Sequence, residues 1–387
     1  MERPMRIALV CTGLGRVQRG FETAAAQLFD KLRSHHDVVL YQGARPSGSG
    51  RVYHVPNIPR AAWKSLISDR RSYRYEQLTF SAGLMPFLLA HRPDVVHYPD
   101  ITLGNAVRKI RDLLSLRFVM VMWNGGPSPP HHVESCDFVQ QVSPVEYRQA
   151  VEYGVPESRM TLVPNGLDCE RFSAGVEHTL TRRRYGIPEN RQIVLSCAAI
   201  NSSHKRIDYL IEEFSRLDPN RFFLVVAGQR HEETPAIERL ARGILKNNCL
   251  FLTVPNFEMP ALYRAADIMV LCSLREGLPI VLLEAMASGI PVVAHDSELF
   301  RWVMGSSNCL IDMQVSGHLA TKIKLVLTDP DKARSAARIN LANVQKRFDW
   351  AEILPQYVQM YERAIHLGRR PIVGTRGSES AVNTRSA

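Results

Sequence analysis

The sequence predicts an α/β protein with two domains, each a mainly parallel sheet covered by helices. Its 387 residues favour two domains, or one large one. Both halves alternate short apolar runs with helical patterns, which is typical of βαβ units and parallel strands. A turn at 164–168 and the polar stretch 173–184 separate the two halves, so we place the domain boundary there.

The first half contains six apolar runs that fit strands, with a clear helix after the first of them. That helix, at 21–32, has apolar residues three and four positions apart, as an amphipathic helix requires. The expected strands are 6–11, 37–41, 94–98, 117–123, 138–142 and 160–163.

The second half repeats the alternation without repeating the sequence. Its expected strands are 192–199, 222–227, 249–254, 267–271, 290–294 and 308–311. Its expected helices are 207–216, 236–246, 260–265, 280–287 and 318–327. A last amphipathic helix is expected at 350–366. Residues 367–387 are rich in Arg, Ser and Gly with almost nothing to bury, so we expect a disordered tail.

The composition narrows the class of partner. The formal net charge of +10 and the pI near 9.4 indicate nucleic acid, an acidic membrane surface or phosphorylated small molecules. No zinc finger or RNA-recognition signature is present, so we expect no nucleic acid partner. No apolar run approaches the roughly 18–20 residues of a membrane span, and no signal-peptide core precedes the first strand, so we expect a cytoplasmic protein. The seven cysteines are scattered, which favours reduced, buried thiols.

The segment 51–92 concentrates positive charge. It has seven basic residues against two acidic ones, with aromatic residues among them. The simpler interpretation is a helix over the core with a solvated basic face. The alternative is a patch for anionic lipid headgroups or a phosphorylated acceptor, which would hold the protein at the inner face of a membrane.

The stretch 271–296 has the pattern of a strand end, a tight loop, a helix and a second strand. Gly277 and Pro279 suit the loop and the first helical turn. Gly289 suits the end of the helix expected at 280–287. The free N–H groups at such a helix start point into the crevice where α/β sheets bind phosphate.

Two glutamates, Glu276 and Glu284, flank this helix start. Glu284 is either a surface residue on an ordinary helix or, given its apolar neighbours, a buried carboxylate. A buried carboxylate needs a hydrogen-bonding partner, and a sugar hydroxyl would serve. The two carboxylates are far apart and have no His, Asp or Cys nearby, so we expect no metal site.

The glycine-containing loop at 13–20 fails the dinucleotide pattern G-x-G-x-x-G, because Gln18 occupies the third glycine position. It is either a flexible loop before a helix or a loop in which Gly15 and Gly20 let the backbone approach a ligand.

A basic pair, Lys205 and Arg206, follows the strand expected at 192–199. Two cations at a strand end, just before a helix, form a plausible diphosphate clamp. A solvated loop is the simpler interpretation of this pair alone.

Taken together, these motifs resemble those of retaining glycosyltransferases with the GT-B fold and of the glycosyltransferase family 4 type. Glu276 and Glu284, with the residues that follow to 294, closely resemble the E-x7-E signature. Further similarities occur in the same order along the chain: an interdomain motif at 163–168 with 171–172, the diphosphate-binding lysine at Lys205, the strand end beside the nucleotide at 225–228, and the closing helix at 348–350 and 357–361. The similarity is strong from about 162 to 361 and thinner before it.

The resemblance implies two Rossmann-like domains whose parallel sheets face each other across a cleft. The acceptor domain would span 1–172 and the nucleotide-sugar donor domain 185–349. A crossover helix at 350–366 would pack back on the first domain, and 367–387 would form the tail.

The resemblance also implies roles for single residues. Glu276 would contact the donor sugar, Lys205 would neutralise the diphosphate, and Arg206 would replace an arginine that family members usually carry a few residues earlier. The implied donor-binding residues are Glu284, which would hold the ribose, with Gly277, Leu278, Pro279, Ile280, Gly228, Val254 and Asn201. The implied acceptor-side residues are Gly15, Gly20, His97 and Asn124, although a lone histidine also fits a structural role.

The function implied is a hexosyltransferase-type glycosyltransferase. It would move a sugar from a UDP- or GDP-linked donor to a sugar, lipid-linked or small-molecule acceptor, with retention and without a metal or other cofactor. Such enzymes serve polysaccharide, glycolipid or glycoconjugate biosynthesis. Two alternatives stay open: a non-catalytic nucleotide-sugar-binding protein, and a GT-B-fold epimerase, hydrolase or phosphorylase. Only a transferase would give a glycoside product when donor and acceptor are mixed.

Overall fold

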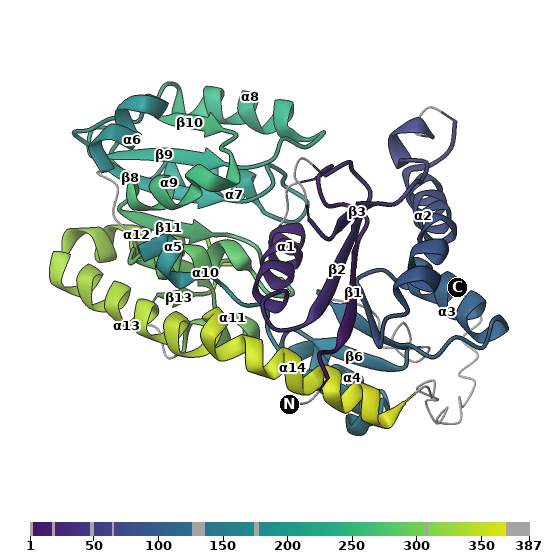
Figure 1. Cartoon of the computed structure of the whole chain (residues 1–387). Helices are drawn as coiled ribbons and strands as arrows, with labels where there is room; N and C mark the ends of the chain where they lie inside the picture. The colour runs from purple at the N-terminus through teal and green to yellow at the C-terminus, as the bar shows by residue number, and fades with distance from the viewer. Residues whose placement is uncertain are drawn as a thin grey trace, which may run out of the picture. The chain divides into compact units, whose positions relative to one another are not determined.

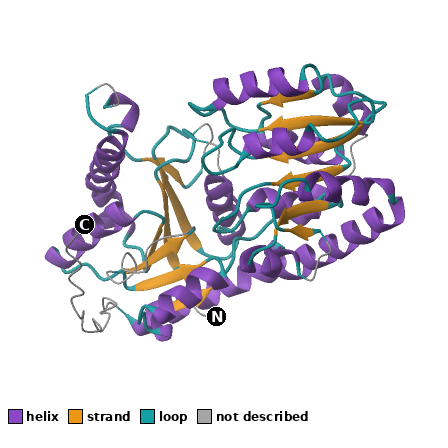
Figure 2. Ribbon diagram, turned by 180° about the vertical axis from the view of Figure 1, so that it is seen from behind, coloured by secondary structure: helices purple, strands orange, loops and turns teal. Residues whose placement is uncertain are grey.

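The structure is a computed structural model and describes residues 3–17, 20–46, 50–63, 66–125, 136–173, 178–305 and 309–368. It contains two sheets of parallel strands, each flanked by helices (Figure 1 and Figure 2). The α/β class with two Rossmann-like sheets is therefore confirmed. Within the described ranges, no helix has the length and apolar character needed to cross a membrane.

Contacts divide the chain into two units. The first unit takes in Met1–Gly15, Arg33–Val163 and Val358–Ala387, as far as these ranges are described. The second unit takes in Arg16–Leu32 and Pro164–Tyr357, again as far as these ranges are described. The chain thus passes from one unit to the other more than once, and we describe each unit separately.

The sheet of the first unit has seven strands in the order β3-β2-β1-β4-β5-β6-β7. The strands are β1 Arg6–Cys11, β2 Asp37–Gln42, β3 Val52–His54, β4 Val95–Tyr98, β5 Val119–Asn124, β6 Phe138–Gln141 and β7 Met160–Leu162. Every residue of β4, β5 and β6 is buried, as expected of parallel strands that are covered on both faces.

The first unit's helices include a closely packed pair, α2 and α3. Apolar side chains of this pair, among them Phe80 and Leu103, are fully buried in one core cluster with the sheet. The helices and 3-10 turns of this unit are η1 Arg60–Ala62, α2 Asp69–His91, α3 Ile101–Leu113, α4 Pro144–Glu152, η3 Glu157–Arg159 and the part of α14 Trp350–Leu367 that begins at Val358.

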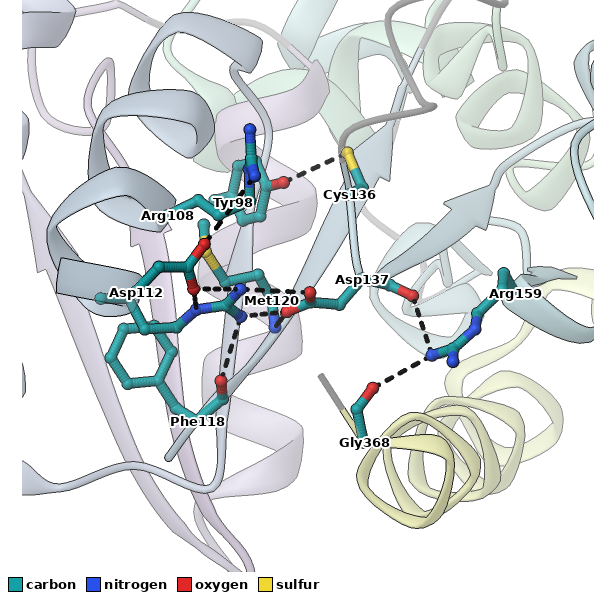
Figure 3. Close-up of polar contacts among 10 residues, drawn as sticks. Tyr98, Arg108, Asp112, Phe118, Met120, Cys136, Asp137, Arg159 and Gly368 are labelled. Carbon is teal, nitrogen blue, oxygen red and sulfur yellow. Dashed lines mark hydrogen bonds and ion pairs between the residues drawn. The ribbon is translucent and has the colours of Figure 1, made fainter. Parts of the chain in front are cut away.

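A buried ion pair joins α3 to the start of β6 (Figure 3). The Arg111 guanidinium contacts the Asp137 carboxylate, and the two side chains are 3% and 0% exposed. The same carboxylate accepts a hydrogen bond of 2.9 Å from the backbone N–H of Met120, in β5. The pair therefore connects three elements that are distant in sequence.

The sheet of the second unit has six strands in the order β10-β9-β8-β11-β12-β13. The strands are β8 Gln192–Cys197, β9 Phe222–Ala227, β10 Cys249–Leu252, β11 Ile268–Leu271, β12 Val292–His295 and β13 Leu310–Ile311. The helices and the 3-10 turn of this unit, besides the start of α14, are α1 Gly20–Leu32, α5 Cys169–Ser173, α6 His178–Tyr185, α7 Ile207–Phe214, α8 Thr234–Leu245, η4 Asn256–Glu258, α9 Met259–Arg264, α10 Ile280–Ala287, α11 Glu298–Met304, α12 His318–Thr328 and α13 Pro330–Phe348.

The segment at 163–168 bonds to the start of α14 inside the second unit. The Leu167 N–H donates to the Phe348 carbonyl at 2.7 Å, and the Trp350 N–H donates to the Leu167 carbonyl at 3.0 Å. A side chain at Gly166 would place its Cβ 2.4 Å from the Trp350 ring. Glycine is therefore required by this close contact.

The expected strands and helices are present, and their ends agree with the prediction or shift by one or two residues. The strand expected at 192–199 ends at Cys197, the helix expected at 207–216 ends at Phe214, and the last helix extends to Leu367. The remainder of the expected tail, 369–387, lies outside the described residues, as does Asn308 of the last expected strand.

Several elements were not predicted. The helices α3, α4, α5, α6 and α11 had no expected bounds, and neither had the strand β3 and the long helix α13. The strand β3 has three residues at the sheet edge and none of them is fully buried, so it lacks an apolar run. The helix α13 buries only four side chains. Its start was nevertheless signalled, because Asp329 caps it by accepting from the Lys332 N–H at 3.1 Å and Pro330 follows.

Candidate active site

The helix α10 has the bounds that the sequence predicts. The Pro279 carbonyl accepts from the Leu282 N–H at 3.0 Å where the helix begins. Gly289, with φ +69°, provides the left-handed conformation just past its end. Seven of the eight residues of α10 are buried, so this helix is held firmly against its surroundings, which include β11.

Glu276 and Lys205, which are far apart in sequence, form an ion pair in the second unit. Their side chains are only 10% and 17% exposed. His204 lies beside them, with Nε2 at 3.9 Å from a Glu276 carboxylate oxygen and 2.9 Å from the Arg275 carbonyl oxygen. This arrangement offers a carboxylate for hydroxyl groups and an ammonium group for an anion within one small region.

Asn201 shapes the loop that carries Lys205. The buried Asn201 side chain accepts hydrogen bonds from the backbone N–H groups of His204 at 3.2 Å and Lys205 at 2.8 Å. These bonds hold the loop in the conformation that brings Lys205 to Glu276. Asn201, which was expected to bind the donor, thus has a positioning contact in the structure.

Arg206 has different partners from its neighbour Lys205. Its guanidinium donates to the Met313 carbonyl at 3.1 Å and lies 4.2 Å from the centre of the Tyr209 ring. The described contacts bring Lys205 to Glu276, and they place Arg206 against Met313 and Tyr209. The expected clamp of two adjacent cations therefore stays a prediction for Arg206.

Glu284 is a buried carboxylate, 5% exposed, inside α10. The Tyr263 hydroxyl, from α9, donates to its Oε2 at 2.7 Å. Burial raises the pKa of Glu284 to about 7, opposed by the bond from Tyr263 and by the charge of Arg171. The partner that the sequence required is thus a tyrosine, which nothing in the sequence pattern identified.

The other expected donor-side residues lie in the same unit. The side chains of Leu278 and Ile280 are both 8% exposed. A Cβ at Gly228 would lie 1.7 Å from the Ala198 carbonyl oxygen, so two strand ends approach closely there. Gly277 and Pro279 are also buried, and Val254, just after β10, is partly buried.

The two glycines of the first loop belong to different units. Gly20 begins α1, and a Cβ there would lie 3.1 Å from Ile280, so the starts of α1 and α10 are adjacent. Gly15, with φ +79°, lies against Ala44 in the first unit. Gln18, the residue that breaks the dinucleotide pattern, lies outside the described residues.

His97 lies in the interior of the first unit. It is 1% exposed, stacks on Trp123 with ring centres 4.8 Å apart, and has Nδ1 at 2.9 Å from the Tyr361 hydroxyl oxygen. Burial lowers its pKa to about 3, despite a hydrogen bond with Gln140 that acts in the opposite direction. These contacts support the structural interpretation of this histidine.

Asn124, at the end of β5, is also buried. Its side-chain amide donates to the Gln141 side-chain oxygen at 2.7 Å, which links the ends of β5 and β6. Carboxyl ends of parallel strands are where α/β sheets bind ligands. Asn124 therefore lies at the edge of the sheet where an acceptor is expected, and its side chain is held by Gln141.

Another buried carboxylate, Glu146, was overlooked in the sequence. It lies in the first turn of α4, just after β6, and is 5% exposed. Burial raises its pKa to about 7. The order Ser143-Pro-Val-Glu146 matches a helix capping pattern, and that signal would have located the helix start.

No group of three or more His, Cys, Asp or Glu side chains suited to a metal ion occurs in the described part of the chain. The expectation that no metal takes part stays a prediction.

Two family descriptions match the chain, one on each half. Residues 19–171 match Glycosyltransferase Family 4, and residues 177–341 match Glycosyl transferases group 1.

Curated relatives with glycosyltransferase names match part or most of the chain. A D-inositol 3-phosphate glycosyltransferase of Geodermatophilus obscurus is 32% identical over 57% of this chain and 51% of its own length. A mannosylfructose-phosphate synthase of Agrobacterium fabrum is 33% identical over 43% of this chain and 39% of its own length. The chain thus spans about half or less of these two relatives. A D-inositol 3-phosphate glycosyltransferase of Mycolicibacterium smegmatis is 25% identical over 93% of this chain and 86% of its own length.

Solved structures share the fold at low sequence identity. Sucrose-phosphate synthase from Thermosynechococcus elongatus superposes with a TM-score of 0.80 at 18% identity, over 94% of this chain and 99% of that one. Anabaena HepE in complex with UDP-glucose superposes with a TM-score of 0.75 at 16% identity, over 92% of this chain and 99% of that one. With the family matches on both halves, these results place the chain among the GT-B glycosyltransferases of the family 4 (group 1) type.

Proposed function

We propose that this glycosyltransferase transfers a sugar from a UDP- or GDP-linked donor, with retention of configuration and without a metal ion. The observation that carries the proposal is the Glu276–Lys205 pair in the unit that also holds α10 and Glu284. A nucleotide sugar has three parts that need recognition: sugar hydroxyls, a diphosphate and a ribose. Glu276 would serve the first, Lys205 with the α10 N-terminus the second, and Glu284 the third.

In the proposed reaction, the bond between the anomeric carbon and the diphosphate oxygen breaks while the acceptor oxygen bonds to the same face of the sugar. The acceptor's proton passes to the departing phosphate oxygen, and a nucleotide diphosphate leaves. Positive charge develops on the sugar ring and negative charge on the phosphate. A cation and a helix N-terminus that are already in place stabilise the developing anion without reorganising.

The names of similar proteins support the proposed donor and suggest a class of acceptor. HepE was solved with UDP and with UDP-glucose, which favours a uridine nucleotide. One curated relative is named for inositol phosphate, and another is named for mannosylfructose phosphate. We therefore place small phosphorylated polyols and sugars first among acceptors, ahead of lipid-linked ones. We also propose that the protein resides in the cytoplasm, with or without contact to the inner surface of the membrane.

The test begins with thermal shifts against UDP- and GDP-linked sugars, because a ligand that binds only the native state raises the melting temperature. The donor with the largest shift is then incubated with phosphorylated and neutral acceptors, with and without EDTA. We expect a glycoside product whose anomeric configuration, measured by NMR coupling, equals that of the donor.

Other outcomes would contradict the proposal. Nucleotide diphosphate release without glycoside would indicate a hydrolase, and conversion of the nucleotide sugar itself would indicate an epimerase. Donor binding without turnover across the acceptor panel would indicate a binding protein. A product with inverted configuration would contradict the proposed retention. Activity abolished by EDTA would contradict the proposed independence of a metal ion.

A further inference from the structure

A groove of about 790 Å³ lies between α2 and α3 in the first unit. Four of its lining side chains are cationic: Arg70 and Arg74 from α2, and Arg108 and Lys109 from α3. None of the residues that line the groove is acidic. None of them belongs to the donor-side residues described above.

The four cations lie on two helices that pack against each other. Arg70 and Arg74 are four residues apart, so they lie on the same face of α2. Like charges at this spacing repel each other and destabilise a helix. Lys109, on the facing helix, adds to the repulsion. An arrangement that costs stability in the free protein is offset when an anion occupies the groove.

Nearby carboxylates neutralise little of this charge. Asp112 lies 3.8 Å from Arg108, but it also contacts Arg111 (Figure 3). Asp100 accepts from the Tyr73 hydroxyl at 2.8 Å and caps α3 through the Leu103 N–H at 2.9 Å. In the described part of the chain, no carboxylate lies within ion-pair distance of Arg70, Arg74 or Lys109.

The remaining lining gives the groove an apolar part. Leu78 and Ile101 line it beside the charged residues, and Leu78 is 37% exposed. A ligand with a phosphate and a short carbon skeleton would contact both kinds of surface. Two arginines can each bind a phosphate in bidentate fashion, and a lysine adds a point charge.

We propose that the α2–α3 groove binds a phosphomonoester, with its phosphate held by Arg70, Arg74 and Lys109 and its carbon skeleton on Leu78 and Ile101. The inference uses no residue of the donor site and holds whether or not the chain transfers sugar. A free phosphomonoester and a phosphorylated lipid headgroup share this chemistry, so the experiment distinguishes them.

The experiment compares the full chain with Arg70→Gln/Arg74→Gln. The control is Arg334→Gln/Arg338→Gln, which removes two exposed arginines at the same spacing from α13 in the second unit. Calorimetry with sn-glycerol 1-phosphate, with and without saturating UDP, measures soluble binding. Co-sedimentation with vesicles of phosphatidic acid, whose headgroup is a phosphomonoester, and phosphatidylcholine, against phosphatidylcholine alone, measures headgroup binding.

We expect glycerol phosphate to bind with the same affinity with and without UDP. The Arg70→Gln/Arg74→Gln chain should bind at least tenfold more weakly, and the control within twofold of the unmodified chain. If only the phosphatidic acid vesicles bind, with the same pattern of variants, the ligand is a lipid headgroup. Equal losses in both double variants, or no binding of either probe, would overturn the proposal. UDP binding, measured in the same titrations, tests the proposed function separately.

Discussion

Glu276 and Lys205 neutralise each other in a largely buried pair, so a change at either one leaves the other as an uncompensated charge. We expect Glu276→Gln and Lys205→Met each to lower kcat/KM by about 100-fold, because each removes a contact that strengthens in the transition state. Rates of nucleotide diphosphate release with a saturating acceptor measure the loss.

Arg206→Ala provides the comparison, because Arg206 is the next residue but contacts Met313 and Tyr209. Arg206→Ala should lower kcat/KM by about tenfold or less. A loss equal to that of Lys205→Met would mean that both cations act on the diphosphate. Unchanged turnover in Glu276→Gln would remove this glutamate from the site.

We expect Glu284 to make donor binding depend on pH, because burial raises its pKa to about 7. Only the ionised carboxylate can accept hydrogen bonds at both oxygens from two ribose hydroxyls. The affinity for UDP should therefore rise by about tenfold from pH 6 to pH 8 and level off above it. Calorimetry at several pH values measures this.

Glu284→Gln should bind UDP more weakly and with a flat pH profile. Glu276→Gln should keep the wild-type slope, because UDP lacks the transferable donor sugar that Glu276 is proposed to contact. An unchanged slope in Glu284→Gln would assign the titration to another group.

At the scale of elements, the Arg111–Asp137 pair holds α3, β5 and β6 together. Asp137→Ala should lower the free energy of unfolding by about 3–5 kcal/mol, because it leaves a buried guanidinium without its partner. Asp112→Ala is the matched control. Its carboxylate also contacts Arg111 but is 49% exposed, so its removal should cost below about 1 kcal/mol. Urea unfolding measures both, and equal costs would contradict the assignment.

Glu146 at the start of α4 makes stability depend on pH in a predictable direction. Its pKa is about 7 in the folded chain and 4.5 without the surrounding structure, so the folded state binds the proton more tightly. The contribution to stability is present below about pH 4.5 and is lost as the pH rises to about 7. Glu146→Gln should therefore be more stable than the unmodified chain by about 1–2 kcal/mol at pH 8, and similar to it at pH 4.5. A series of thermal unfolding measurements from pH 4.5 to pH 8 would show this difference in stability develop. A constant difference across this range would mean that Glu146 is not the titrating group.

At the scale of the whole molecule, the first unit depends on residues from the end of the chain. Val358 onward belongs to it, and Tyr361 covers the buried pair of His97 and Trp123. A chain that ends at Tyr357 should expose this aromatic surface, bind a hydrophobic dye and lose cooperative unfolding. A chain that ends at Gly368 is the control and should unfold as the full chain does. Equal behaviour of the two would mean that the last helix contributes little to the first unit.

The sequence predicted the strands because parallel strands buried on both faces leave continuous apolar runs, as in β4 and β11. It missed β3, since a three-residue edge strand leaves no such run, and α13, whose cap was present but whose buried face is narrow. Helix α10 was predicted to the residue because glycine and proline mark both ends.

For the site, the glutamates and Lys205 were predicted from their motifs, and the structure brings Lys205 to Glu276. The Tyr263–Glu284 bond could not be predicted, because it depends on how two helices of the folded chain pack. The different contacts of Lys205 and Arg206 depend on the Asn201 bonds and on the left-handed backbone at Arg206. Neither is visible in a pattern of residue types.

The contact between His97 and Tyr361, which are 264 residues apart, also determines when the first unit can mature during synthesis. A nascent chain that has released β1 to β7 from the ribosome still lacks the helix that seals His97 and Trp123. The six-stranded sheet must be translated before that helix emerges. The first half made is therefore the last to be completed, and its exposed aromatic surface is available to chaperones throughout the synthesis of the second.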